Sequence, residues 1–267
     1  MKKILAVTAI LSAVCPAAFA QDGRDPLLTR PGLEVGAQAA HYHYEEPGVA
    51  KLIGLRAGGV GAFTFTQGGA FFKADGRISL GSLNYQGSGT RSNIPDYIFE
   101  ARFVAGADLQ AGEGVVLSPY AGLGYRYLYN DLRGYTRSGG TLYAGYRRYS
   151  NYLYAPVGFT ARIRVGDGWV LAPTLEADVF LRGMQVTKGS DTNLGYIDVT
   201  STQDRGRGHR VYLMLEKDRL AIGAWTHYWH IGDSDLQFGG VVQGVPRFLH
   251  EPENYTREIG VEVRYRF

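Results

Sequence analysis

The chain has one cysteine, Cys15, and no long hydrophobic run beyond its N-terminal segment. After residue 20, no stretch approaches the roughly 18 consecutive apolar residues that a membrane-spanning helix requires. The sequence therefore excludes a helical membrane protein. Because we expect Cys15 to be removed with the N-terminal segment, the mature chain has no disulfide, and its stability must come from other contacts.

The chain also has no large excess of charge of either sign. The chain has 28 Lys and Arg residues against 25 Asp and Glu residues, and the balance becomes 26 against 25 once Lys2 and Lys3 are removed with the N-terminal segment. A nucleic-acid-binding surface needs clustered positive charge. We therefore expect no nucleic-acid partner.

The first 20 residues have the three-part layout of a secretory signal peptide. Two lysines precede an apolar run at 4–14, which is too short to span a bilayer as a helix. A small-residue site at 18–20 follows, and we expect cleavage after Ala20. The residues before Cys15 lack the pattern of a lipoprotein signal, which disfavours a lipid anchor. Residues 1–20 are predicted to be a cleaved signal peptide.

Glycine and tyrosine are abundant, with 37 and 19 copies. An apolar residue at every second position marks ten candidate strands. The clearest is 169–182, where Leu171 and Leu175 share one face and Glu176 lies on the other. A Gly-Asp-Gly hairpin signal at 166–168 separates it from a similar strand at 153–165. The remaining candidates are 33–42, 50–65, 70–85, 97–110, 114–130, 207–217, 219–231 and 254–267.

The connections between these strands alternate in length. Short turns are expected at 66–69, 111–113, 166–167 and 217–218. Longer polar segments separate the other pairs, at 43–49, 86–96, 131–148, 184–206 and 232–253. Transmembrane barrels have this arrangement, with short turns on the periplasmic side and longer loops outside.

The last strand alternates between apolar residues and charges and ends on an aromatic residue. Its apolar face holds Val261, Val263, Tyr265 and Phe267. Such a terminal strand resembles the closing strand of bacterial outer-membrane β-barrels. The resemblance implies an all-β fold, a transmembrane antiparallel up-and-down β-barrel, for which we expect ten strands with eight or twelve as alternatives. It also implies that this segment is the assembly signal read by the barrel-insertion machinery.

The same resemblance places the protein in the cell outer membrane. Residues 21–32 are then a periplasmic N-terminal lead-in and residues 33–267 the barrel. If the apolar face of each strand contacts lipid, the opposite face points into the lumen, and it carries charges of both signs. They are Glu34, Lys73, Asp75, Arg77, Glu100, Arg102, Asp108, Arg126, Arg162, Arg164, Glu176, Asp178, Arg182, Arg210, Glu216, Glu258, Glu262, Arg264, Arg266 and Arg56. In so narrow a tube these charges should pair and close the lumen.

Several aromatic and histidine clusters are candidates for chemistry. His41 and His43 share one face of the first strand, where a membrane-interface role is favoured over metal binding. Trp225, His227 and Trp229 share a face of the ninth strand, and packing is favoured over a ligand platform. Tyrosine-rich stretches with interleaved arginines flank the segment 131–148; lining of the interface is favoured over a binding surface.

The sequence also contains partial resemblances to enzymatic barrels. Omptin proteases resemble the chain in strand number, and the nearest candidates for their acidic and histidine groups are His230, Asp233 and Asp235, with Asp191 or Asp198 opposite. The omptin spacing is not matched. A His-x-Ser tripeptide of the lipid A deacylase kind is also missing, because Arg148 stands two residues before Ser150. No catalytic, metal or cofactor residue is assigned.

We therefore expect a non-enzymatic barrel that acts through its extracellular loops, in adhesion, envelope integrity or lipopolysaccharide contact. Its expected partners are outer-membrane lipid and lipopolysaccharide, the insertion machinery, and a host or envelope protein bound by the loops. The alternatives are a narrow channel for small solutes and a hydrolase at the outer rim, either omptin-like or lipid A-modifying. The sequence does not name a ligand.

Overall fold

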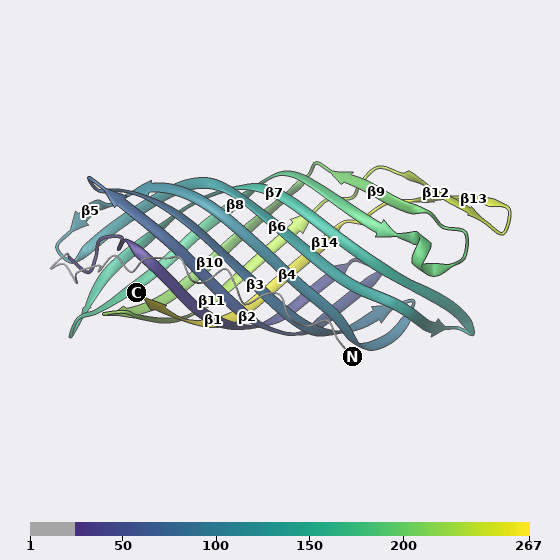
Figure 1. Cartoon of the computed structure of the whole chain (residues 1–267), viewed down its shortest axis with the longest axis horizontal. Coiled ribbons are helices and arrows are strands. Elements are labelled where there is room, and N and C mark those ends of the chain that lie inside the picture. The colour runs from purple at the N-terminus through teal and green to yellow at the C-terminus, as the bar shows by residue number, and fades with distance from the viewer. Residues whose placement is uncertain (1–24) are drawn as a thin grey trace, which may run out of the picture.

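The computed structural model describes residues 25–267, so the expected signal peptide and residues 21–24 of the expected lead-in lie outside the described residues. Ten long strands form one closed antiparallel barrel (Figure 1). They are β1 (Gly32–Glu46), β2 (Ala50–Gln67), β3 (Ala70–Gly87), β4 (Gly89–Ala107), β6 (Val115–Ser138), β7 (Thr141–Gly166), β8 (Trp169–Lys188), β10 (Gly206–Lys217), β11 (Leu220–Ile231) and β14 (Asn254–Arg266). The predicted fold class and the count of ten strands are confirmed.

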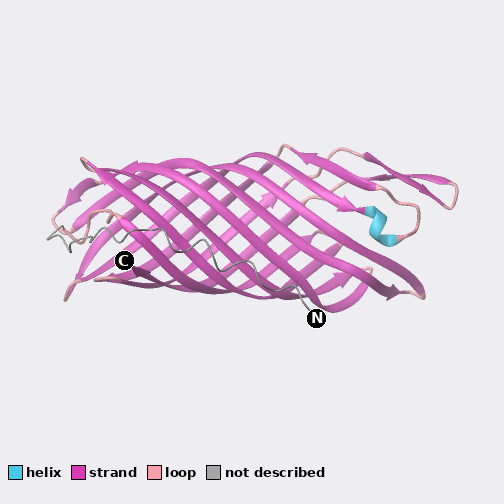
Figure 2. Cartoon of the chain, viewed as in Figure 1, coloured by secondary structure: helices cyan, strands magenta, loops and turns pink. Residues whose placement is uncertain are grey.

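Each barrel strand pairs with its neighbour in the chain, and β14 returns to pair with β1. Four short strands and one helical turn complete the structure. They are β5 (Leu109–Gly112), β9 (Asp198–Gln203), β12 (Gln237–Val242), β13 (Val245–Leu249) and the 3-10 turn η1 (Gly189–Thr192). Strands β9, β12 and β13 and the turn η1 extend the end of the barrel that lies opposite the carboxy terminus (Figures 1 and 2).

The outer loops differ from the sequence prediction at three places. Strand β1 runs through Glu46, β3 and β4 are separated by one residue, and β6 and β7 continue as a hairpin to Ser138 and Thr141. Backbone pairing continues there although the side chains no longer form one apolar face. The segments 43–49, 86–96 and 131–148 are therefore largely strand. Among the outer segments, only 184–206 and 232–253 carry elements of their own, which are η1 and β9 in the first and β12 and β13 in the second.

The outer wall of the barrel is apolar. Large hydrophobic side chains such as Leu55, Leu80 and Val261 point away from the lumen and are exposed on every barrel strand. Closed barrels present such a face to lipid because every backbone group is paired within the sheet. Among residues 25–267, no helix has the length and hydrophobicity needed to cross a membrane.

Tyrosines form a belt on this wall toward the outer end. The rings of Tyr97 and Tyr129 stack at 4.7 Å, and Tyr149 lies 5.2 Å from Tyr129. A second ladder lies on β11 and β14, where the ring centroids of Tyr228 and Tyr255 are 6.3 Å apart. Amphipathic rings gather where a bilayer meets water, so these ladders mark the outer interface, as expected for the tyrosines around the segment 131–148.

A β-bulge in β8 corrects one prediction. Leu153 pairs with Arg182 and Tyr154 with Phe180, so Leu181 has no partner on β7. The extra residue inverts the alternation, and both Leu181 and Arg182 are exposed on the outer wall. Arg182 was expected in the lumen, and this prediction is wrong because simple alternation does not carry across a bulge.

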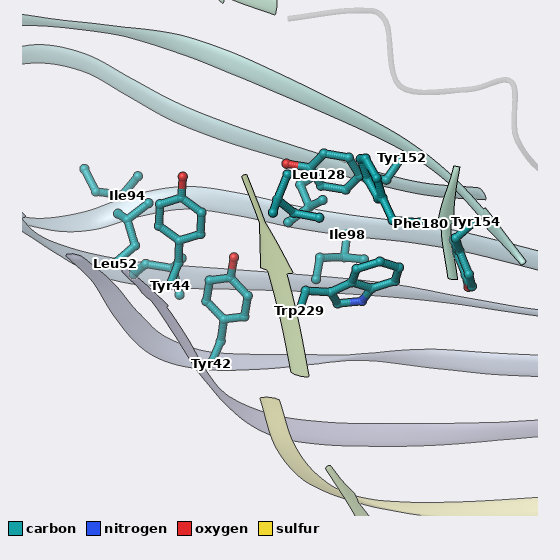
Figure 3. Packing of buried hydrophobic residues seen from close by; sticks show 12 residues of the cluster. Tyr42, Tyr44, Leu52, Ile94, Ile98, Leu128, Tyr152, Tyr154, Phe180 and Trp229 are labelled. Carbon is teal, nitrogen blue, oxygen red and sulfur yellow. The ribbon is translucent and has the colours of Figure 1, made fainter. Parts of the chain in front are cut away.

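An apolar and aromatic layer fills the outer half of the lumen (Figure 3). Ile98 lies one inward-facing position beyond Glu100 on β4, and Phe180 lies one beyond Asp178 on β8. Glycine makes room for these rings: a Cβ atom on Gly124 would lie 2.2 Å from Cζ of Tyr154. The barrel wall has small residues where the lumen holds large ones.

The barrel end that holds the carboxy terminus, expected from the sequence to be the periplasmic end, is closed by the residues that precede β1. Leu27 is fully buried against Val116 and Val170. The backbone N–H and the hydroxyl of Thr29 both donate to Asp108, at 2.7 Å each. The described part of the lead-in therefore lies inside the barrel mouth and contributes to its packing.

Candidate functional site

The middle of the lumen is a network of buried ion pairs. Glu100 accepts hydrogen bonds from Arg77 at 2.7 Å and from Arg210 at 2.5 Å. Arg77 also reaches Glu258 at 2.8 Å. These residues come from four strands, and each is more than nine-tenths buried. Buried charges are tolerated when each is paired and hydrogen-bonded, and these four residues meet that condition.

The network continues toward the periplasmic end. Arg102 donates to Glu176 at 2.6 Å and to Asp75 at 2.8 Å. Arg264 pairs with Glu262 at 2.7 Å. The network and the apolar layer outside it together block the lumen with protein side chains.

The predicted lumen residues fall into two groups. Eight of the ten singled out from the sequence point inward: Glu100, Arg102, Arg126, Arg162, Glu176, Asp178, Glu262 and Arg264. Arg126 lies 3.5 Å from Glu258 and stacks over the Trp229 ring at 5.5 Å. Arg162 donates to the hydroxyls of Thr29 and Ser118 at 3.1 and 3.0 Å.

Arg182 and Arg164 do not belong to the buried network. Arg182 faces outward because of the bulge in β8. Arg164 is exposed at the periplasmic end, where it pairs with Asp25 at 2.9 Å. The prediction of a buried charge pair at Arg164 is therefore wrong. The strand is exposed there because it extends past the packed part of the lumen.

His227 was a candidate for chemistry, and its surroundings rule it out as a catalytic base. Its Nδ1 lies 3.2 Å from the Arg77 guanidinium and its Nε2 lies 3.1 Å from Asp178. A guanidinium only donates, so Nδ1 accepts and the Nε2–H donates to Asp178. Both nitrogens are occupied and the ring is buried beside Trp229. His227, Trp225 and Trp229 act in lumen packing.

The omptin-like candidates do not come together either. His230 faces outward, stacked on Tyr255 at 4.7 Å with Glu253 2.6 Å from its Nε2. Asp233 pairs with Arg205 at 2.7 Å, and Asp191 with Arg147 at 2.7 Å. Each group is engaged in a loop contact of its own. This arrangement does not form the aspartate and histidine pairs of an omptin site.

His41 and His43 also lie on the outer wall, while Tyr42 and Tyr44 between them point into the lumen. His43 is 3.4 Å from a Glu45 oxygen. In the part of the chain that the structure describes, no three histidine, cysteine, aspartate or glutamate residues are grouped as a metal site would require.

A cavity at the outer end of the barrel is the best candidate for a binding site. Its volume is about 440 Å³, within the range of small-molecule sites. Strand ends and the outer segments line it, mainly with apolar and aromatic side chains that include Ile94, Leu132, Tyr143, Tyr146, Val199 and Leu249. A concave apolar pocket with a few polar groups is the usual form of a ligand site.

The polar groups of this outer cavity gather around Arg148. Its NH1 donates to Glu46 at 2.6 Å and its NH2 to the Tyr44 hydroxyl at 3.0 Å. The NH2 group also pairs with Glu251. Arg148 and the two carboxylates are all about 5% exposed, so the group is buried within the cavity wall.

Sequence reasoning did not find this group. Glu46, Arg148 and Glu251 lie about one hundred residues apart along the chain, on β1, on β7 and just before β14. The sequence singles out Arg148 as one of the arginines interleaved with the tyrosines around 131–148 and as the residue in place of a catalytic histidine, but not as a partner of Glu46 or Glu251. No local motif connects the three residues, because the closure of the barrel brings them together.

Burial and the nearby Glu46 carboxylate raise the pKa of Glu251 to about 7, against the lowering effect of Arg148. Because the pKa of Glu251 is raised in the folded segment 233–253, protonation of Glu251 stabilises the folded arrangement of this segment; this stabilisation is complete below about pH 4.5 and is lost as the pH rises through about 7. Amide hydrogen exchange over 233–253, corrected for intrinsic rates, should therefore speed up by as much as about tenfold per pH unit within this window.

Glu251→Gln should remove most of this pH dependence because the amide does not titrate. Glu253→Gln is the matched control: Glu253 is exposed, and its hydrogen bonds from Tyr255 and His230 lower its pKa. If exchange in the unaltered chain shows the same protection at pH 5 and pH 8, the titration of Glu251 does not affect the stability of the segment 233–253.

The residues of the predicted assembly signal lie at the barrel seam. Val261, Val263, Tyr265 and Phe267 are all exposed on the outer wall. Val261 and Val263 pair with β1 on one side and β11 on the other. Their position is suited to recognition before the barrel closes, and the recognition itself stays a prediction.

A closed barrel with an apolar wall, aromatic belts and a charge-filled lumen defines an outer-membrane β-barrel protein, and the outer membrane is where such a wall is buried. No protein-family model matches the chain, and no curated protein matches it. Among solved structures it is similar to the outer membrane protease OmpT from Escherichia coli, with 12% identity, a TM-score of 0.55, and coverage of 88% of this chain and 97% of that one.

Two further solved barrels are similar at lower scores. Neisserial surface protein A is 13% identical with a TM-score of 0.37, covering 88% of this chain and 97% of that one. The translocator domain of the autotransporter NalP from Neisseria meningitidis is 16% identical with a TM-score of 0.40, covering 90% of each chain. At these identities the likenesses show the fold alone.

Proposed function

We propose that the protein is a non-enzymatic binding protein of the outer membrane, which recognises its ligand with the extracellular segments above a sealed barrel. The outer cavity carries this proposal. It is lined by five separate parts of the outer segments, and a buried polar group around Arg148 lies in its wall.

The contents of the lumen argue against the channel alternative. A solute that left the outer cavity would have to displace the apolar layer and then the paired charges around Glu100 and Arg210. Breaking one buried pair costs about 3–5 kcal/mol. Wide aqueous channels belong to barrels of 16 or more strands.

The hydrolase alternative lacks a usable base. His227 has both nitrogens occupied, and His230 lies on the outer wall. The likeness to a protease at 12% identity does not transfer an activity. Binding without chemistry is the function that the described groups support best.

We also propose that the outer wall of this binding protein contacts lipopolysaccharide, because two exposed arginines lie beside interfacial rings. Arg207 and Arg257 are exposed beside the Tyr228 and Tyr255 ladder, and neither forms an ion pair within residues 25–267. Exposed arginines next to interfacial rings suit phosphate groups of lipid. By contrast, Arg147 is already paired with Asp191.

The test uses the full chain, refolded in lipid, and a variant in which a short glycine linker replaces residues 236–249. Ser234 and Glu251 are joined by a backbone hydrogen bond of 3.0 Å, so the linker spans a small gap and should leave the barrel folded. We expect a library of neutral, anionic and cationic aromatic fragments to give bound species by native mass spectrometry with the full chain and few with the variant.

Heat-modifiable migration on a gel checks that both proteins are folded. Lipopolysaccharide binding should persist in the variant, because Arg207 and Arg257 remain. Planar-bilayer recordings of the full chain should show no stepwise conductance. If conductance steps occurred while fragment binding was the same for both proteins, the channel function would replace the one proposed here.

A further inference from the structure

The guanidinium of Arg148 is incompletely paired. Its NH1 and NH2 groups bind Glu46, Glu251 and Tyr44, whereas its Nε–H is buried and has no hydrogen-bond partner within residues 25–267. A buried donor without an acceptor is destabilising, because it has lost its hydrogen bond to water. Arg148 lines the outer cavity, so an acceptor that enters the cavity and displaces the atoms covering Nε would complete its hydrogen bonds.

The charge of that acceptor is limited by the groups already present. Two carboxylates surround one guanidinium at this point, so a second anion would meet Glu46 and Glu251 at close range. Arg91 is the other cation of the cavity, and it donates to the backbone oxygen of Leu132 at 2.7 Å, which holds a strand end in place. Above about pH 7, where Glu251 is ionised, the two guanidinium groups balance the two carboxylates, so the cavity then favours a ligand without net charge.

The body of the ligand is limited by the apolar lining. Leucine, isoleucine and valine side chains and the rings of Tyr85, Tyr143, Tyr146 and Tyr196 surround the space. Aromatic faces and aliphatic groups bind rings and hydrocarbon by burial of apolar surface. A ligand of drug-like size fits the volume of about 440 Å³.

We propose that the outer cavity binds uncharged, predominantly aromatic or alicyclic molecules that carry one hydrogen-bond acceptor, such as a carbonyl, which accepts from Nε–H of Arg148. This inference rests on the proposed binding function and names its ligand class. The apolar body enters between the tyrosines and leucines, and the acceptor reaches Arg148. Glu46 and Glu251 hold the guanidinium in position and exclude anions.

Benzophenone tests this class directly, because it is neutral, has two rings and one carbonyl, and attaches covalently to nearby C–H groups when irradiated. The full chain in liposomes is irradiated with benzophenone, with anionic 4-benzoylbenzoate, or with the cation of 4-(aminomethyl)benzophenone. We expect cross-links to the cavity segments 142–148 and 249–252, with benzophenone at least about tenfold more effective than either charged probe. Cross-links on lipid-facing residues measure the background.

Two variants test the geometry. Ala144→Phe places a ring in the cavity and should abolish these cross-links, whereas Ala155→Phe, on the lipid side of the same strand, should leave them unchanged. Arg148→Lys keeps the cation but removes the Nε–H. Diphenylmethane has the two rings but lacks the carbonyl, so the ratio of the two affinities reports the hydrogen bond. Arg148→Lys should lower this ratio of benzophenone affinity to diphenylmethane affinity by about tenfold, the effect of one charge-assisted hydrogen bond.

The outcomes separate the inference from the proposed function. If a charged probe labels the cavity better than benzophenone does, the ligand class is wrong and the binding function stands. Equal affinities of benzophenone and diphenylmethane in the unaltered chain would mean that water pairs with Nε–H, and the inference would again be overturned. If no probe labels the cavity segments of the folded protein, both the inference and the proposed function fail.

Discussion

Glu176→Ala should destabilise the barrel by about 3–5 kcal/mol, the usual cost of removing one partner from a buried ionic group. Glu176 accepts hydrogen bonds from Arg102 at 2.6 Å and from Tyr120 at 2.7 Å, and Arg210 lies 2.8 Å away. Its removal leaves two buried guanidinium groups short of an anion. The measurement is the urea midpoint of unfolding in liposomes, with the temperature of heat-modifiable migration as a second readout.

Asp191→Ala is the matched control for this prediction. Asp191 also pairs with an arginine, but it lies in η1 beyond the barrel, and its partner Arg147 is only partly covered. Surface pairs contribute little because water screens them. A change that is small and equal for both variants would mean that the lumen is hydrated, and the account of a sealed lumen would then be wrong.

Deletion of Phe267 should lower the amount of protein in the outer membrane several-fold. The Phe267 N–H donates to the Leu33 carbonyl at 2.9 Å, and its ring packs edge-on against Tyr265 at 5.2 Å. The deletion removes both the aromatic terminus expected to be read during insertion and one contact of the β1–β14 seam. Chains that fail to insert are exposed to proteases, so their steady-state amount falls.

Phe267→Trp and Tyr255→Ala separate the terminal signal from general loss of aromatic contact. The first variant keeps an aromatic terminus and should be inserted normally. The second removes a ring from the outer end of the same strand and should have a much smaller effect on abundance. Normal abundance of the chain without Phe267, measured by immunoblot of the outer-membrane fraction, would contradict the role of this residue in assembly.

The sequence predicted the strands well wherever one side of the wall faces lipid. Residues 254–267 and 169–180 alternate because lipid and lumen impose opposite chemistry on neighbouring side chains, and this pattern is local. It also assigned most lumen charges correctly, including Glu100 and Arg126. Past the lipid, in the β6–β7 hairpin, no apolar face is required, so no local pattern indicates that pairing continues to Ser138 and Thr141.

Arg182 shows the limit of local reasoning. Whether β8 contains a bulge depends on how it pairs with Leu153 and Tyr154 of β7, and nothing in the alternation of β8 itself reports that pairing. Arg164 shows a second limit, because the length of strand that lies outside the packed lumen depends on how neighbouring strands are staggered.

The amino-acid sequence by itself determined the class of fold, the number of strands, and the sign and side of most charges, because these follow from the two-residue period of a strand between lipid and lumen. Only the tertiary structure decided which charges pair and where a ligand can bind. Glu46, Arg148 and Glu251 form one group because β1, β7 and the segment before β14 meet at the outer end of a closed barrel. Contacts between residues so far apart in the chain depend on strand tilt, stagger and closure, which are properties of the whole sheet.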